Sequence, residues 1–266
     1  MNPVLVTQGT SPVILVFPHV GTYVPEDIAA RLNHEGRKLR DTDWHVDRLY
    51  DGLLAGATTV RATFHRYAID ANRDPSGASL YPGQNTTGLV PLTDFDDQPI
   101  WESAPDAAEV ARRRELFHAP YHAALRAEVD RVKALHGIAV VYDCHSIRSV
   151  CPFLFDGVLP DFNVGTDNGA TCDPAIEAVV TGTAKHAAQY SSVLNGRFRG
   201  GWTTRHYGRP QQGVHAIQME LAQSTYLESE DAPFAYDERK AARLRAVLTA
   251  ILERVESAAL ALGGKR

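Results

Sequence analysis

Three short apolar runs constrain the fold of this chain more than any other feature of its sequence. They are Val13–Phe17, Ile138–Tyr142 and Val214–Met219, and each is rich in β-branched residues. Near-continuous apolar runs of this length are typical of strands that are buried on both faces of a sheet. Segments with helical spacing lie between the runs. The sequence therefore predicts an α/β fold with a mixed, mostly parallel sheet flanked by helices.

The predicted helices follow the residues that favour helix ends. We expect one helix to start at Pro25, one to run from Trp44 to about Gly52, one from Pro105 to about His136, and two at Ala175–Gln189 and Asp237–Leu262. In the longest of them, Pro120 is expected to kink or split the helix, and Gly137 stands at the usual C′ position. The segment Ser76–Asp97 is predicted to be a long loop, and such loops commonly form lids or binding loops.

The composition indicates a soluble protein of one domain. The chain has 266 residues, of which 44% are hydrophobic, and no repeat or low-complexity linker divides it, so we expect a single domain over residues 1–266. The formal net charge of −5 argues against a nucleic-acid partner, although a local positive pocket for a small anion remains compatible with it. The oligomeric state is left open.

No sequence feature indicates secretion or a membrane. Residues 1–9 lack the basic start and apolar core of a signal peptide, and Val13–Phe17 is too short to span a bilayer. The three cysteines show no regular spacing, so a disulfide framework is not expected. We therefore expect a cytoplasmic protein with reduced thiols and no membrane partner.

Residues suited to metal or proton chemistry follow all three apolar runs. His19 follows the first run, His145 the second and Glu220 the third. Ligands of open α/β sheets bind beyond the carboxyl ends of the strands, so these side chains are expected to meet at one edge. A single histidine is more often a satisfied core or surface group. Three such strand ends together favour a metal site.

Two histidines need a carboxylate to complete the usual ligand set of a catalytic zinc, which leaves one position open. The segment Asp41–Asp47 offers several candidates near a predicted helix start. Asp43 is the preferred ligand because it would enter the first turn and still face the strand edge. Asp41 is interpreted as a helix cap or as a hydrogen-bond partner of a ligand.

Two clusters are candidates for binding an anionic substrate. In the first, Asn72 and Arg73 would grip a carboxylate and Asp70 would hold Arg73, because the guanidinium fork matches a carboxylate at two points. A surface salt bridge is an equal alternative. The second cluster lies beside paired glycines and contains Arg197, Arg199, Arg205 and His206. No phosphate-binding glycine motif is present, so a nucleotide cofactor is not expected.

Two other patterns are interpreted as non-catalytic. His118 and His122 have the i, i+4 spacing of zinc ligands, but Ala119 stands where a metalloprotease has its glutamate. Cys144 adjoins His145, and neighbours on a strand point to opposite faces. Cys144 is therefore expected in the core.

Short blocks of the sequence together resemble the N-formylglutamate amidohydrolase family. They occur in family order between about His19 and Tyr226, at residues 18–21, 41–45, 70–73, 143–146, 200–208 and 217–220. The resemblance implies a zinc-carboxypeptidase-like (phosphorylase/hydrolase-like) α/β fold. It also implies a metal-dependent amidohydrolase that cleaves N-formyl-L-glutamate, a small acidic amide, to formate and L-glutamate in histidine degradation.

The resemblance further implies one Zn²⁺, or another divalent transition metal, in each chain. From the strand ends and the segment before the predicted helix, we expect the metal ligands to be His19, Asp43 and His145. Glu220 and Arg66 would be catalytic, the first as proton shuttle and the second on the oxyanion. The substrate carboxylates would meet Asn72, Arg73 and Arg205.

One departure from wider relatives keeps the third ligand open. Related deacylases take two ligands from His-x-x-Glu, but Thr22 stands at the glutamate position. Asp41, Glu26 and Asp47 therefore remain alternatives to Asp43. Two other functions also remain alternatives. One is a related deacylase for another N-acylated acidic amino acid, and the other is a binding protein without turnover. Activity on formyliminoglutamate is left open.

Overall fold

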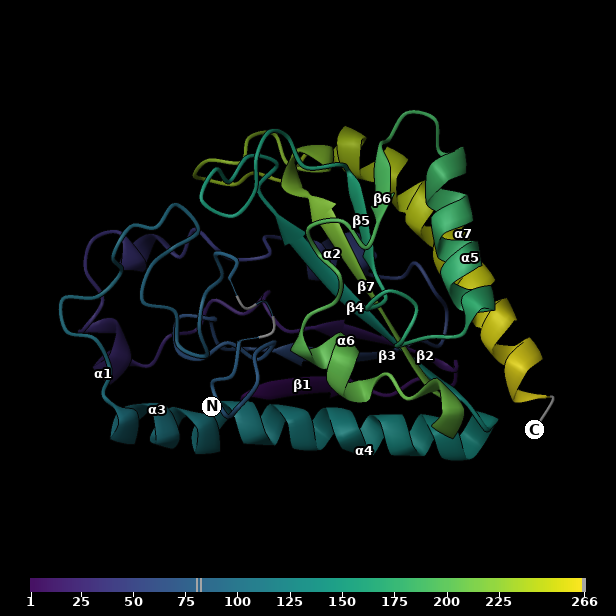
Figure 1. The fold of residues 1–266 in the computed structure, drawn as a ribbon, viewed down its shortest axis with the longest axis horizontal. Helices are drawn as coiled ribbons and strands as arrows, with labels where there is room; N and C mark the ends of the chain where they lie inside the picture. Colours follow the sequence, from purple (N-terminus) through teal and green to yellow (C-terminus); the bar gives the residue numbers. More distant parts are fainter. Residues whose placement is uncertain (80, 82, 265–266) are drawn as a thin grey trace.

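The computed structural model describes residues 1–79, 81 and 83–264 and contains a seven-stranded sheet (Figure 1). The strand order is β1-β3-β2-β4-β7-β5-β6. β1 and β3 pair antiparallel, as do β5 and β7, whereas the other four neighbouring pairs are parallel. The predicted mixed, mostly parallel sheet is confirmed. The strands are β1 (Val4–Thr7), β2 (Val13–Phe17), β3 (Thr58–Ala62), β4 (Ala139–Ile147), β5 (Phe162–Gly165), β6 (Ser192–Leu194) and β7 (Val214–Ala222).

The α-helices of the described residues are α1 (Glu26–Ala29), α2 (Val46–Tyr50), α3 (Ala107–Arg113), α4 (Ala119–His136), α5 (Pro174–His186), α6 (Trp202–Tyr207) and α7 (Glu238–Gly263). A π-helical turn, Arg114–His118, separates α3 from α4. Pro120 thus lies in the first turn of α4, so the predicted long helix is split there. Gly137 ends α4 with a φ of 70°, as predicted for a C′ glycine. Short 3₁₀ turns occur at Gly36–Lys38, Pro210–Gln212 and Gln223–Thr225.

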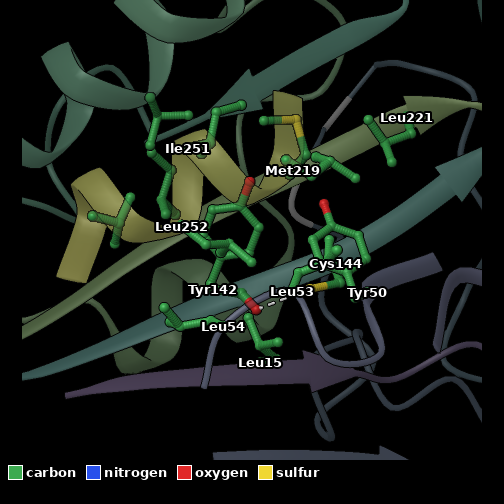
Figure 2. Packing of buried hydrophobic residues seen from close by; sticks show 14 of the residues in the cluster. Leu15, Tyr50, Leu53, Leu54, Tyr142, Cys144, Met219, Leu221, Ile251 and Leu252 are labelled. Atoms are coloured by element: carbon green, nitrogen blue, oxygen red, sulfur yellow. Dashed lines mark hydrogen bonds between the residues drawn. The ribbon is translucent and has the colours of Figure 1, made fainter. Parts of the chain in front are cut away.

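Helices cover both faces of the sheet. α4 packs against β1 to β4 on one face, and α2, α5 and α7 cover the other, as the separation of α4 from α5 and α7 in Figure 1 shows. Alternate residues of β4 enter the two cores: Tyr142 and Cys144 lie on the α7 side and Val141 on the α4 side. Figure 2 shows Tyr142 and Cys144 within the cluster that also contains Met219 of β7 and Ile251 of α7. Cys144 is buried in the core, as predicted.

The central strands extend further than their apolar runs. β4 continues to Ile147 and β7 to Ala222, so His145 and Glu220 lie within strands and do not follow them. The ladder continues because backbone hydrogen bonding does not depend on side-chain polarity. The short strands β1, β3, β5 and β6 and the helix α6 were not predicted, because short segments carry little hydrophobic periodicity.

Two further predictions concern the loop and the membrane. The described part of residues 76–97 contains no helix and only an isolated bridge at Thr93, in agreement with the predicted long loop. Among the described residues, no helix combines the length and the apolar character needed to cross a bilayer. The three cysteines are free and buried.

Candidate active site

The carboxyl ends of the central parallel strands carry the predicted functional residues. β2 ends at Phe17, two residues before His19. β4 carries His145, which is the register partner of Glu220 on the neighbouring strand β7. All three functional side chains line one pocket together with Asp43. The edge predicted from the three apolar runs is therefore where these residues meet.

His19, Asp43 and His145 form a group that could hold a metal ion. Their potential ligand atoms lie within 4.8 Å of one another, and all three residues are buried. Nδ1 of His145 lies 3.1 Å from Oδ2 of Asp43, and Nδ1 of His19 lies 3.7 Å from the same oxygen. Burial raises the pKa of Asp43, but the two histidines outweigh it and hold that pKa below its usual range.

Asp43 reaches this group from a loop. The helix α2 begins only at Val46, so Asp43 does not lie in its first turn. Its backbone N–H donates to the carbonyl oxygen of His19 at 3.1 Å, and this bond fixes the two residues side by side. The prediction of Asp43 at the strand edge agrees with the structure, whereas the expected helical position is wrong.

The second ring nitrogen of each histidine faces another carboxylate. Nε2 of His19 lies 2.7 Å from Oδ1 of Asp70, and Nε2 of His145 lies 3.0 Å from Oδ1 of Asp143. Such a partner orients a metal-binding imidazole and holds the ring proton on Nε2. Nδ1 is then free to bind a metal. Asp143 takes this role for His145. For His19 the structure places Asp70 there.

Asp41 has different partners from those predicted. Its Oδ2 accepts hydrogen bonds from the Tyr67 hydroxyl at 2.8 Å and from the Phe95 backbone N–H at 3.0 Å. α2 has no side-chain cap. Burial raises the pKa of Asp41 to about 7. Asp41 therefore neither caps the helix nor supports a histidine, and it bonds to residues 67 and 95, of which Phe95 lines the pocket.

Glu220 lies in the pocket outside the histidine–aspartate group. Its Oε2 accepts a hydrogen bond from Nε2 of Gln218 at 3.1 Å, and Oε1 of Gln218 accepts one from the Gly201 N–H at 2.6 Å. Burial raises the pKa of Glu220 to about 8. Gln218 was missed by the sequence reasoning. Its signal was the spacing of two residues from Glu220, which puts both side chains on one face of β7.

Arg66 lies between the carboxylates of the site. It is 5% exposed, and its Nη2 donates to Oδ2 of Asp70 at 2.8 Å. Its Nη1 lies 3.9 Å from Oδ1 of Asp43, and its guanidinium carbon lies 4.9 Å from the ring centroid of Phe95. Arg66 therefore presents a buried positive charge beside the candidate metal ligands. This position is compatible with its predicted role of stabilising the oxyanion.

Asn72 and Arg73 also line the pocket. Oδ1 of Asn72 accepts a hydrogen bond from the Thr203 N–H at 2.8 Å, and its Nδ2 lies 3.1 Å from Nε2 of His145. Arg73 donates from Nε to the carbonyl oxygen of Thr87 at 2.8 Å, and its Nη1 lies 3.7 Å from Oδ2 of Asp70. Because Asp70 is fully buried, this ion pair is not a surface salt bridge.

Arg205 is not among the pocket-lining residues. Its Nη2 pairs with Oδ1 of Asp167 at 3.3 Å, and its Nε donates to the carbonyl oxygen of Gly200 at 2.9 Å. Arg197, from the same predicted basic cluster, lines the pocket in its place. Local sequence could not separate the two, because Arg197 lies in the loop after β6 and Arg205 in α6, and tertiary packing decides which of them faces the pocket.

His118 and His122 bond to the backbone on either side of Asn72. Nε2 of His118 lies 3.0 Å from the carbonyl oxygen of Arg73, and Nε2 of His122 lies 2.8 Å from that of Ala71. These nitrogens bond to the segment that carries Asn72, so the pair does not form the metal site that its spacing allows. The long loop adds further pocket residues that the sequence did not single out, namely Tyr81, Thr86, Thr87 and Phe95.

Fold and site together define a class of protein. A histidine–aspartate group, a nearby buried glutamate and several arginines meet at the carboxyl edge of a mostly parallel sheet, as in a metal-dependent α/β hydrolase. Residues 11–227 match the model of the N-formylglutamate amidohydrolase family, and the chain belongs to that family. The resemblance found in the short sequence blocks is thus confirmed.

Individual relatives match over nearly their whole length. The chain is 46% identical to an N-formylglutamate deformylase of Pseudomonas putida, and the match covers 97% of this chain and 96% of that protein. It is 48% identical to the protein of the same name from Pseudomonas aeruginosa, covering 92% and 93%. The crystal structure of an N-formylglutamate amidohydrolase from Ralstonia eutropha superposes with a TM-score of 0.75 at 25% identity, covering 100% of this chain and 98% of that one.

Proposed function

We propose that this protein hydrolyses N-formyl-L-glutamate to formate and L-glutamate, as a step of histidine degradation in the cytoplasm. The observation that carries the proposal is the buried His19–Asp43–His145 group beside Glu220, in a pocket that also contains arginines. The relatives described above bear the name of this activity. Family membership and site chemistry therefore support the same reaction.

The group fits a zinc ion. Two imidazole nitrogens and one carboxylate oxygen are the ligand types of catalytic zinc sites, which keep one position for water or substrate. We propose that His19, Asp43 and His145 hold one Zn²⁺ in each chain, with Asp70 and Asp143 orienting the two rings. A bound zinc ion lowers the pKa of a water molecule and polarises a carbonyl oxygen.

The surrounding residues supply the proton transfers and the charge. A carboxylate oxygen of Glu220 would accept the proton of the attacking water and return it to the amide nitrogen, because an amine leaves poorly unless it is protonated. The Arg66 guanidinium would stabilise the oxyanion of the tetrahedral intermediate. Asn72 and Arg73 would bind a substrate carboxylate. Arg205 was predicted to bind a substrate carboxylate as well, but it has no such role here because it pairs with Asp167 outside the pocket.

The test is formate release from N-formyl-L-glutamate by the purified protein, together with its metal content. N-acetyl-L-glutamate serves as the comparison that separates a deformylase from a broader deacylase. His19→Ala and His145→Ala are expected to lose the metal and nearly all activity. His34→Ala, an exposed histidine away from the pocket, is the matched control and should change neither. Full metal content and turnover in both pocket variants would overturn the site.

A further inference from the structure

Arg197 differs from the other arginines of the pocket in its lack of a negative partner. Arg66 and Arg73 lie 2.8 Å and 3.7 Å from Asp70. Among the described residues, no carboxylate lies within ion-pair distance of Arg197, although it lines the same pocket and is half-buried. A positive charge removed from water without a counter-ion is costly, so a ligand that brings the missing charge would bind favourably.

The hydrogen bonds of Arg197 hold its guanidinium in place and leave donors free. Its Nε donates to the carbonyl oxygen of Leu154 and its Nη2 to that of Asn85, both at 2.7 Å. Both acceptors are neutral. A guanidinium has five N–H donors, and these two bonds use only two of them. Arg197 therefore has a fixed position and can still donate to a carboxylate.

The wall beside Arg197 is apolar. Its guanidinium carbon lies 5.5 Å from the ring centroid of Phe198, and Leu154 and Phe198 pack against a buried cluster that includes Ile147. All three side chains also line the pocket. Such a wall suits the methylene groups of an acidic amino acid, whose charged end would continue to Arg197.

We infer that Arg197 binds the side-chain carboxylate of the substrate and thereby selects N-formyl amino acids with an acidic side chain. Arg73 and Asn72, which also line the pocket, remain for the α-carboxylate, and Asn72 lies beside His145. The inference rests on the proposed function and adds the residue that determines specificity. A site built for a charged group rejects a neutral isostere, because its own buried charge would be left unpaired.

The experiment compares N-formyl-L-glutamate with N-formyl-L-glutamine, which has nearly the same shape but no side-chain charge. The quantity measured is the ratio of kcat/KM for the two compounds. In Arg197→Met, kcat/KM for the charged substrate should fall about 10²- to 10³-fold. The value of kcat/KM for the neutral compound should change little, so the ratio of charged to neutral should fall by nearly the same factor. Arg199→Met, an exposed neighbour outside the pocket lining, is the matched control and should leave the ratio unchanged.

The comparison separates recognition from a structural role. Arg197 also joins two loops, and a loss of that support would lower the rates for both compounds equally. An equal fall, or an unchanged ratio, would overturn the assignment. If Arg197→Met does not fold, Arg197→Lys keeps the charge without the fork, and it should lower the rate for the charged substrate selectively. A wild-type protein that releases formate from neither compound would instead refute the proposed function itself.

Discussion

His145 on β4 and Glu220 on β7 are direct register partners in two neighbouring parallel strands. Asp143 and Gln218, two residues earlier, are partners in the same way, so the four side chains share one face of the sheet. Neighbouring strands lie about 4.8 Å apart. This register places a candidate metal ligand and a candidate proton shuttle on adjacent rigid strands, and it lets each be tested without moving the other.

The first prediction separates the two aspartates of the loop before α2. Asp43→Ala should remove most of the bound metal, because its Oδ2 lies between the two histidine rings. Asp41→Ala should weaken metal binding by less than about tenfold, since that carboxylate contacts Tyr67 and Phe95. Elemental analysis after dialysis against a chelator measures both. The reverse order would move the ligand to Asp41.

The second prediction concerns Arg73. Arg73→Lys keeps the positive charge but loses the planar fork, so KM for N-formyl-L-glutamate should rise by about tenfold or more, with a smaller change in kcat. Steady-state kinetics provide the measurement. Arg199→Lys makes the same exchange at an exposed position and should have no effect. An unchanged KM in Arg73→Lys would mean that Arg73 does not bind the substrate and only contacts Thr87 and Asp70.

The elements predictable from sequence are those with a strong hydrophobic pattern. All residues of β2 are apolar and buried, and both of its ends were predicted correctly. β4 and β7 were predicted too short because the last residues of each strand include polar functional residues, which interrupt the apolar run. β6 is a short strand at the sheet edge with mostly exposed residues, and such a strand has no pattern to detect.

The same distinction applies to the site. His19, His145 and Glu220 were predictable because strand direction brings the ends of parallel strands to one edge. The choice of Asp70 over Asp41 as the partner of His19, and of Arg197 over Arg205 in the pocket, depends on how loops and the short helix α6 pack. Loop paths result from long-range packing, and no local spacing encodes them.

The third prediction tests how closely the backbone approaches Asn72. A Cβ added at Gly201 would lie 2.4 Å from Nδ2 of Asn72, so Gly201→Ala must displace that side chain. Since Asn72 lies beside His145, we expect kcat/KM to fall about 10²-fold, the effect of a displacement of roughly 1 Å in a catalytic site. In α5, Gly182 has no atom within 4 Å of an added Cβ. Gly182→Ala is therefore the control and should retain activity. Full activity in Gly201→Ala would show that turnover does not need Asn72 in this position.

The last prediction concerns Glu220, because it separates proton transfer from metal binding. Glutamine has nearly the same shape as glutamate, and its side-chain oxygen can still accept the hydrogen bond from Gln218. Glu220→Gln should therefore keep the fold, the melting temperature and the metal. Its kcat should fall about 10²- to 10⁴-fold, the range expected when general acid–base help is lost. Metal content, Tm and kcat are measured on one preparation, with the exposed Glu253→Gln as control. Loss of the metal would make Glu220 a ligand, and full turnover with the metal retained would leave the proposed mechanism without its base.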